Sequence, residues 1–202
     1  MQASADSTSP NGQIFLRVEQ ALPLIKKLKD QGKKIVLTQG SFDMVHIGHG
    51  RYCAQAKNYG DILFVGVDSD RKIKVRKGDD RPIVPLTERL EMLTYLKSVD
   101  YVVAKHLDDP KYSLIKAVRP DVLVATKKTY TSAQLKELKK YCGRIEVLDP
   151  MATTSTSAKI RLLQMGAAQK ISATLTRKLI HTIEDVLSEL KGESEGGSDD
   201  KK

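Results

Sequence analysis

The stretch that decides the fold is KKIVLTQGSFDMVHIGHG, residues 33–50. It opens with an apolar run rich in β-branched side chains, residues 35–38, which predicts a buried strand. A turn that contains Gly40 follows, and the apolar spacing from His49 onward predicts a helix through Tyr59. The segment is therefore expected to form a strand, a tight turn and a helix in direct succession.

Such an arrangement suits a bound phosphate. A strand that ends in a tight turn before a helix directs free backbone N–H groups and the positive end of the helix dipole toward one point. Gly40 and Gly48 have no Cβ, so a bulky ligand can approach the backbone there. His46 and His49 are three residues apart, so both can donate hydrogen bonds to one phosphoryl group from the first helical turn. We therefore expect a polyphosphate site with His46 and His49 as catalytic residues.

The pattern Gly-x-Phe-Asp-x-x-His-x-Gly-His at residues 40–49 resembles the signature of the nucleotidylyltransferase superfamily that includes the cytidylyltransferases. Three further segments are similar to the bacterial heptose 1-phosphate adenylyltransferases, which form the C-terminal half of bifunctional ADP-heptose synthases. These segments are VDSD at 67–70, KGDDRP at 77–82 and VDYVV at 99–103. The resemblance covers about residues 32–163, which is most of the chain.

The resemblance implies transfer of a nucleoside monophosphate from an NTP, with ATP favoured, to a phosphorylated acceptor such as heptose 1-phosphate. Pyrophosphate would be released and Mg²⁺ required. Glycerol 3-phosphate cytidylyltransferase and FAD synthetase share this fold, so a CTP-dependent or FAD synthetase-like reaction stays open. A relative that binds nucleotides without catalysis also stays open, because ATKKTY at 125–130 departs from the family's Lys-Gly-Gly-Asp-Tyr loop.

The resemblance also assigns roles by motif position. Lys77 joins His46 and His49 as a catalytic residue. Acceptor binding is assigned to Lys72, Lys74 and Arg89. Nucleotide binding is assigned to Gly40, Ser41, Phe42, Asp43, Gly48, Asp68, Thr126, Lys127, Ser155, Thr156 and Ser157. For Asp43 a turn or capping role stays open beside a metal contact, and no metal ligand is assigned.

Apolar runs that alternate with helical patterns predict a parallel sheet covered on both faces. The fold class is thus α/β: a single Rossmann-like domain with a five-stranded parallel sheet and helices on both faces, plus a C-terminal helix. The expected strands are residues 35–38, 61–67, 99–104, 121–125 and 144–148. Ligands of such sheets bind beyond the carboxyl ends of the strands. Residues 68–85 are expected to form an irregular basic loop, and Gly166 to end a helix that starts near residue 158.

Composition shifts divide the chain further. We expect a disordered leader at 1–13, the nucleotidylyltransferase domain at 14–166, a C-terminal helical extension at 167–191 and a disordered tail at 192–202. The extension carries an apolar stripe that suits core packing, a homodimer contact or a partner helix. The stripe consists of Leu175, Leu179, Ile183, Val186, Leu187 and Leu190.

Composition excludes several classes of protein. No apolar run approaches the roughly 20 residues of a membrane span, and the N-terminus lacks the features of a secretory signal. Cys53 and Cys142 have no metal-ligand spacing and are expected to be reduced thiols in a cytoplasmic protein. The net charge of +9 suits small polyanionic substrates. The sequence does not favour a nucleic-acid partner, because the basic residues are dispersed and aromatic residues make up only 5% of the chain.

Overall fold

Apolar segments of five to seven residues form the centre of a parallel sheet in this computed structural model, which describes residues 13–127, 129–149, 151 and 156–195. The chain divides into two compact units, residues 1–153 and 154–202, and each is described by itself. The sheet lies in the first unit, with its strands in the order β1-β4-β3-β2-β5-β6. The strands are β1 (Gln13–Phe15), β2 (Ile35–Gly40), β3 (Ile62–Asp68), β4 (Tyr101–Lys105), β5 (Val122–Thr126) and β6 (Arg144–Leu148).

The expected α/β fold with a parallel sheet is confirmed, but the expected count of five strands is wrong. The sixth strand, β1, is an edge strand of three residues that pairs with β4, where Ile14 lies opposite Val102. Its first residue falls inside the segment expected to be a disordered leader. Three residues are too few to show the alternation by which a strand is recognised in a sequence. The segment forms a strand because it pairs with β4.

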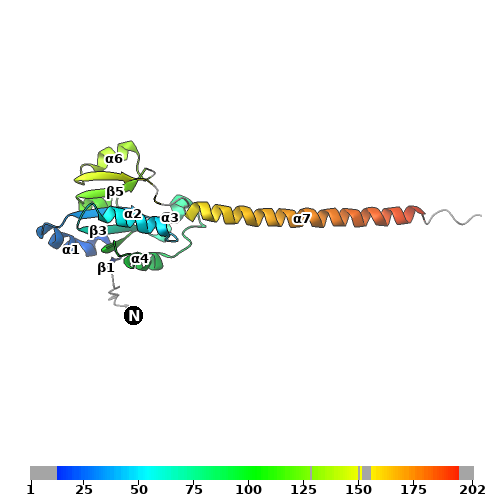
Figure 1. Ribbon diagram of the computed structural model, residues 1–202, viewed down its shortest axis with the longest axis horizontal. Helices are drawn as coiled ribbons and strands as arrows, with labels where there is room; N and C mark the ends of the chain where they lie inside the picture. Colours follow the sequence, from blue (N-terminus) through cyan, green and yellow to red (C-terminus); the bar gives the residue numbers. More distant parts are fainter. Residues whose placement is uncertain (1–12, 128, 150, 152–155, 196–202) are drawn as a thin grey trace, which may run out of the picture. The chain divides into compact units, whose positions relative to one another are not determined.

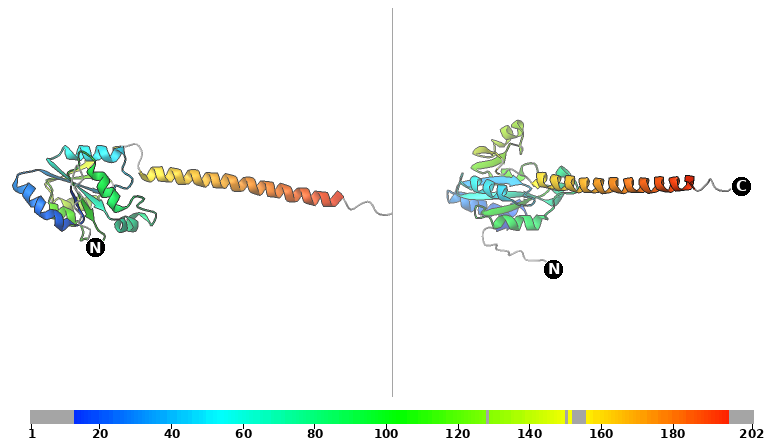
Figure 2. Two further views of the ribbon diagram at one scale, coloured as in Figure 1. Left: turned by 90° about the horizontal axis from the view of Figure 1, so that it is seen from below. Right: turned by 45° about the vertical axis from the view of Figure 1, so that its right-hand side comes forward.

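Helices cover both faces of the sheet, because successive strand residues point to opposite sides. Val36 and Val102 pack with α2 and α4, whereas Leu37 and Val103 pack with α1, α5 and α6. Figure 2 shows α1 and α2 on opposite faces in its left view, and Figure 1 shows α6 at the β6 end of the sheet. The helices are α1 (Val18–Asp30), α2 (Ile47–Lys57), α3 (Asp70–Lys77), α4 (Leu86–Thr94), α5 (Ser113–Val118) and α6 (Ser132–Leu138).

The strand order reverses at β2, which lies between β3 and β5. Gly40 at the end of β2 is level with Val67 in β3, and Thr38 is level with Val124 in β5. The segments that follow these three strands therefore meet at the carboxyl edge of the sheet. The sequence predicted that these segments meet at this edge. Such a switch point is where open α/β sheets bind their ligands.

The expected irregular loop at residues 68–85 is wrong in its first half, where the structure has α3. The Ser69 side chain accepts a hydrogen bond from the Lys72 N–H as the N-cap, and Gly78 ends the helix with a φ of 96°. Within α3 only Ile73 is buried. A helix with one buried residue has no apolar periodicity, which is why the pattern indicated a loop.

The expected helix end at Gly166 is also wrong. α7 (Thr156–Glu195) passes through Gly166 and lies wholly in the second unit. A glycine inside a helix costs only about 1 kcal/mol relative to alanine, and Ala167 and Ala168 continue the helix. α7 also includes residues 192–195, which were expected to belong to a disordered tail. Among the described helices, including α7, there is none whose length and apolar character would let it cross a membrane.

Candidate active site

The turn between β2 and α2 has a strained backbone. Phe42 and Met44 both have left-handed conformations, with φ of 48° and 52°, which L-residues other than glycine rarely adopt. A Cβ at Gly40 would lie 3.1 Å from the Phe42 ring. The chain therefore folds back closely on itself here, and Gly40 is the residue that permits the close approach.

His46 and His49 form a reciprocal cap at the start of α2. His46 Nδ1 accepts a hydrogen bond from the Gly48 N–H at 3.1 Å, and His49 Nδ1 accepts one from the His46 N–H at 3.3 Å. A neutral imidazole that accepts at Nδ1 carries its proton on Nε2. Each ring is therefore oriented by the backbone in the tautomer that donates from Nε2.

The two imidazoles also lie close together, with ring centroids 4.2 Å apart. Desolvation lowers the pKa of His49 to about 4, and the neighbouring His46 ring and Lys77 ammonium contribute to the same shift. The Phe42 ring packs against His49 at 5.4 Å between centroids. His49 is consequently neutral at pH 7. The positive charge of Lys77 beside it would favour a negatively charged ligand there.

Asp43 fixes the turn to the segment that precedes α4. Its buried carboxylate accepts hydrogen bonds from Arg81 Nε at 2.7 Å, from the Ile83 N–H at 3.1 Å and from the Val84 N–H at 3.0 Å. Despite burial, these hydrogen bonds and the Arg81 charge lower the pKa of Asp43. Of the two roles left open for Asp43, the contacts favour the one in the turn over a metal contact.

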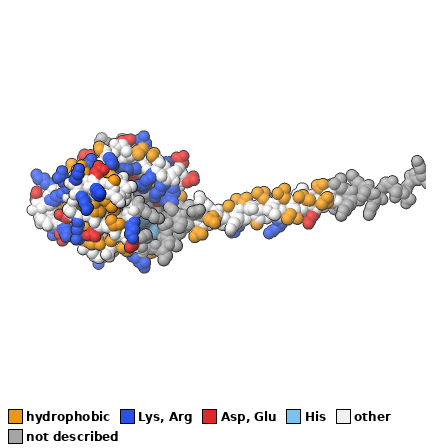
Figure 3. Space-filling model, turned by 90° about the horizontal axis from the view of Figure 1, so that it is seen from above, with side chains coloured by type: hydrophobic (Ala, Val, Ile, Leu, Met, Phe, Trp, Pro, Cys, Tyr) orange, Lys and Arg blue, Asp and Glu red, His pale blue; other side chains and the backbone are white. Residues whose placement is uncertain are grey.

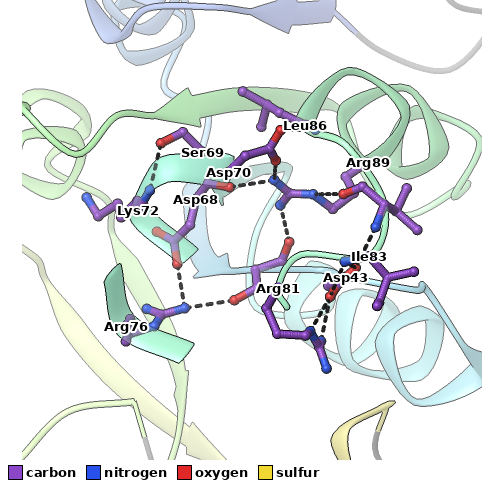
Figure 4. A network of polar contacts seen from close by, with 12 residues as sticks. Asp43, Asp68, Ser69, Asp70, Lys72, Arg76, Arg81, Ile83, Leu86 and Arg89 are labelled. Carbon is purple, nitrogen blue, oxygen red and sulfur yellow. Dashed lines mark hydrogen bonds and ion pairs between the residues drawn. The ribbon is translucent and has the colours of Figure 1, made fainter. Parts of the chain in front are cut away.

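Arg89, expected at the acceptor, is buried at the centre of a polar network (Figure 4). Its guanidinium donates to the carbonyl oxygens of Ser41 and Asp68 and to the Asp70 carboxylate, the last at 2.7 Å. Its Nε donates to the Val84 carbonyl at 2.9 Å. Since these acceptors occupy a fully buried guanidinium, the contacts indicate that Arg89 positions the turn and the end of β3 instead of reaching an acceptor.

Asp68, expected at the nucleotide, is buried between two cations. Its carboxylate pairs with Lys105 at 3.1 Å and with Arg76 at 2.8 Å, and both cations lower its pKa despite burial. Arg76 also donates to the Ser41 hydroxyl at 2.7 Å (Figure 4). Arg76 thus joins the end of β3 to the turn after β2, and Asp68 holds Arg76 in place.

Sequence reasoning missed three residues of this site: Arg76, Arg81 and Lys105. One signal was present for Lys105, because Asp68 and Lys105 end two neighbouring strands and lie level with each other. Arg81 stands in the KGDDRP segment that supported the resemblance, but nothing in that segment identified its partner. The Asp43–Arg81 pair joins residues far apart in the sequence, so it becomes visible only in the fold.

The remaining expected lysines differ in their surroundings. Lys77 ends α3 close enough to lower the pKa of His49. The Lys72 ammonium donates to the His106 carbonyl at 3.2 Å, and Lys74 is exposed on α3. Lys127 pairs with Asp149 at 2.7 Å, with both side chains exposed. Of these lysines, only Lys77 has a described interaction with a catalytic candidate.

The other nucleotide-binding candidates lie in two places. Thr126 ends β5 beside β2, and its N–H donates to the Thr129 hydroxyl at 3.1 Å, which closes the loop that departs from the family pattern. Ser155 lies outside the described residues. Thr156 and Ser157 begin α7, of which only the backbone is described there.

A pocket of about 370 Å³ lies between the turn and α4. Apolar side chains, among them Phe42, Met44 and Met92, line it together with the carboxylates of Glu88 and Glu91. Arg89 also lines the pocket, whereas neither His46 nor His49 does.

The described residues do not fit a Mg²⁺ site built by the protein. Within the described ranges, no group of three or more His, Cys, Asp or Glu side chains is placed to hold a metal ion. The buried carboxylates of Asp43 and Asp68 face Arg81, Arg76 and Lys105. Mg²⁺ stays a prediction, and nothing in the geometry of the turn depends on it.

Comparison of the chain with known proteins shows its family. The Cytidylyltransferase-like family model matches residues 37–179, which include β2 from Leu37 onward, the turn and both histidines. The chain belongs to this family. The family resemblance predicted from residues 40–49 is therefore confirmed, and the cytidylyltransferase-like signature lies where the structure places the paired imidazoles.

Curated relatives in the cytidylyltransferase-like family bear the name bifunctional protein HldE. The protein from a Nitratiruptor species is 50% identical over 111 residues, which are 54% of this chain and 24% of that protein. The protein from Helicobacter hepaticus is 42% identical over 154 residues, which are 76% of this chain and 31% of that protein. This chain thus spans about a quarter to a third of the length of the relatives it matches.

A solved structure extends the likeness to the fold alone. Pantoate-beta-alanine ligase from Francisella tularensis superposes with a TM-score of 0.53 at 16% identity, over 72% of this chain and 69% of that protein. At this identity the likeness concerns architecture. It agrees with the Rossmann-like sheet and its helices.

Proposed function

We propose that the chain is a nucleotidyltransferase that transfers a nucleoside monophosphate, with ATP as the favoured donor, to a phosphorylated sugar such as heptose 1-phosphate and releases pyrophosphate. The observation that carries the proposal is the pair of imidazoles at the start of α2, each held by a backbone N–H so that Nε2 donates. The membership of the cytidylyltransferase-like family and the HldE relatives support the reaction class and the acceptor.

In this mechanism an oxygen of the acceptor phosphate attacks the α-phosphorus in line, and pyrophosphate leaves. The attacking phosphate is already anionic, so the protein needs to supply position and charge stabilisation and no nucleophile of its own. Nε2 of His46 and of His49 would donate to the α- and β-phosphate oxygens, where negative charge grows in the transition state. Backbone N–H groups at Ser41 and Phe42 would contact the α-phosphate beside the positive end of α2.

Lys77 would supply a cation beside the phosphates, since it already influences His49. The turn that presents these groups is held by the Asp43–Arg81 contact. It is also held by Arg89 and Arg76, which both donate hydrogen bonds to Ser41. These four residues act as positioning residues in the proposed reaction. The site therefore consists of a few donors that touch substrate and a buried polar network that fixes them.

Pyrophosphate release tests the reaction. The chain is incubated with ATP, CTP or GTP and Mg²⁺, each with heptose 1-phosphate, glycerol 3-phosphate or FMN. The proposal expects the fastest release with ATP and heptose 1-phosphate, and release lowered at least a hundredfold in the His46→Ala, His49→Ala double variant. Release with CTP and glycerol 3-phosphate instead would reassign base and acceptor. Nucleotide binding without release in any combination would contradict the enzyme assignment.

A further inference from the structure

The three arginines that hold the turn after β2 differ in exposure. The side chains of Arg81 and Arg89 are 11% and 0% exposed, whereas that of Arg76 is 52% exposed. Arg76 uses Nη2 for both of its contacts, with the Ser41 hydroxyl at 2.7 Å and the Asp68 carboxylate at 2.8 Å. Its Nε and Nη1, which carry three of the five donors of a guanidinium, have no hydrogen-bond partner in the part of the chain that the structure describes. Arg76 is therefore anchored by one nitrogen and keeps the other two for a ligand.

The charge around Asp68 is unbalanced. Its buried carboxylate is paired with the Lys105 ammonium at 3.1 Å as well as with Arg76. Burial alone would raise the pKa of Asp68, but the positive charges of Lys105, Arg76 and Lys72 hold this pKa below its ordinary value. Three cations thus surround one carboxylate, and the other two carboxylates of the network are paired with arginines of their own. Two positive charges are therefore in excess beside Asp68.

This excess charge matches a phosphate monoester. Such a group carries a charge of about −1.5 to −2 at pH 7, because its second pKa is about 6. Guanidinium groups bind phosphate oxygens through short, charge-assisted hydrogen bonds. Figure 3 shows Lys and Arg side chains on one face of the first unit, where they favour the approach of anions. The group formed by Asp68, Lys72, Arg76 and Lys105 therefore fits the phosphate of a monoester better than an uncharged part of a substrate.

The position of Arg76 suits the acceptor better than the nucleotide. In the sheet, β2 lies between β3 and β5. The nucleotide-binding candidate Thr126 ends β5, whereas Asp68 joins Arg76 to the end of β3, on the other side of β2 (Figure 4). The contact with Ser41 places the same guanidinium beside the turn whose N–H groups are proposed to contact the α-phosphate. An acceptor phosphate bound by Arg76 would therefore lie next to the phosphorus that it attacks.

We propose that Arg76 binds the phosphate of the acceptor through Nε and Nη1, while Nη2 stays on Ser41 and Asp68. The requirement for a phosphorylated acceptor then resides in Arg76 and in the excess charge beside Asp68. Lys105 neutralises the buried carboxylate, which leaves the charge of Arg76 for the ligand. Arg76 thus takes the place at the acceptor that the sequence assigned to the buried Arg89. The inference rests on the proposed function for the identity of the acceptor.

Binding measured without turnover tests this role in the 202-residue chain. Titration calorimetry compares heptose 1-phosphate with the same heptose lacking its phosphate, with and without α,β-methylene-ATP, which cannot release pyrophosphate. The parent chain should bind the phosphorylated sugar at least tenfold more tightly. Arg76→Gln should abolish most of this preference, whereas the dissociation constant of α,β-methylene-ATP should change less than threefold. Arg76→Lys, which keeps the charge, should lie between the two. Arg71→Gln removes the same charge from an exposed position on α3 and is the matched control, with the preference retained.

The outcomes separate this inference from the proposed function. An unchanged preference in Arg76→Gln would overturn the inference, as would a parent chain that does not bind heptose 1-phosphate. An equal loss of affinity for the sugar phosphate and for α,β-methylene-ATP would show that Arg76 acts only through the turn, which also overturns it. Binding of heptose 1-phosphate that depends on Arg76, without pyrophosphate release from ATP, would contradict the proposed reaction and support the phosphate site. Pyrophosphate release with an unchanged KM for heptose 1-phosphate in Arg76→Gln would do the reverse.

Discussion

The imidazoles of His46 and His49 lie with their centroids 4.2 Å apart, and the backbone of α2's first turn fixes Nδ1 of both rings. The cap of the helix and the proposed phosphate donors are therefore the same two side chains. Because Nδ1 of each ring accepts a hydrogen bond within the turn, Nε2 is the nitrogen that the proposed reaction uses. The two nitrogens of each ring therefore have different roles, Nδ1 in the helix cap and Nε2 in the proposed reaction.

Replacing His49 by Gln and by Asn should have unequal effects. A Gln amide nitrogen lies near the position of Nε2, whereas an Asn amide is shorter and lies near that of Nδ1. We expect His49→Asn to lower pyrophosphate release about a hundredfold or more, the effect of losing one donor to the transition state. His49→Gln should retain at least ten times the activity of His49→Asn. Greater activity in His49→Asn would place the catalytic donor at Nδ1, and equal losses would contradict a donor at the position of Nε2.

Acid should weaken the fold through His49. The pKa of His49 is about 4 in the folded chain, against an ordinary value of 6.5. Between these values the unfolded chain binds more protons, so the stability is fully present above pH 6.5 and is lost as the pH falls through 4. The change is on the order of 2 kcal/mol after allowance for partial exposure. Thermal melts between pH 4 and 7 should be less pH-dependent in His49→Gln than in the parent chain.

Removing the Lys77 ammonium should raise the pKa of His49. The positive charge of Lys77 is one of the causes that lower this pKa, so Lys77→Met should bring it closer to 6.5. Lys74→Met, an exposed lysine three residues earlier on α3, is the matched control and should change it much less. Titration of the His49 ring by NMR measures both. The same direction of shift is expected when ATP binds to the parent chain, because its phosphates favour the charged imidazole.

Neutralising Asp43 should destabilise the first unit. Asp43→Asn leaves the buried Arg81 without its carboxylate, and breaking a buried ion pair costs about 3–5 kcal/mol. Removal of the exposed Arg71–Asp108 pair by Arg71→Ala should cost under about 1 kcal/mol. Urea unfolding compares the two variants. A loss in Asp43→Asn as small as that in Arg71→Ala would show that the turn is held by other contacts.

Arg89→Lys should separate a positioning role from acceptor binding. A lysine cannot reproduce the fork of donors that reaches Ser41, Asp68 and Asp70. We expect a loss of stability of about 2–4 kcal/mol together with a lower kcat for every acceptor. If Arg89 instead contacted the acceptor, KM for the acceptor would rise while the urea midpoint stayed the same.

Much of the first unit follows from local sequence. The run at 35–38 forms β2, and the segment after it forms the turn and α2, because a buried strand and a capped helix start each depend on neighbouring residues. Parallel pairing and helices on both faces follow from apolar runs that alternate with helical patterns. The two histidines could be identified as a pair for the same reason, because a spacing of three positions at a helix start brings their side chains close together.

The elements that were wrong or missing depend on distant partners. β1 exists because β4 offers an open edge, and α3 packs by Ile73 alone, so neither has a periodic signal of its own. Arg89 shows the same limit within the site. Its motif position predicted an acceptor contact, but the fold surrounds it with the carbonyl oxygens of Ser41, Asp68 and Val84.

The sequence by itself determined the strand–turn–helix unit, the paired imidazoles and the family, because these depend on residues within a few positions of one another. Tertiary structure alone decided which charges support the turn. Asp43 meets Arg81 across 38 positions, and Asp68 meets Lys105 across 37. Because these pairs are buried, removing one partner is costly. The pairs produce no periodic pattern in the sequence that would reveal them. The proposed donors of the site are therefore close together in the sequence, and the network that holds them is formed only by the fold.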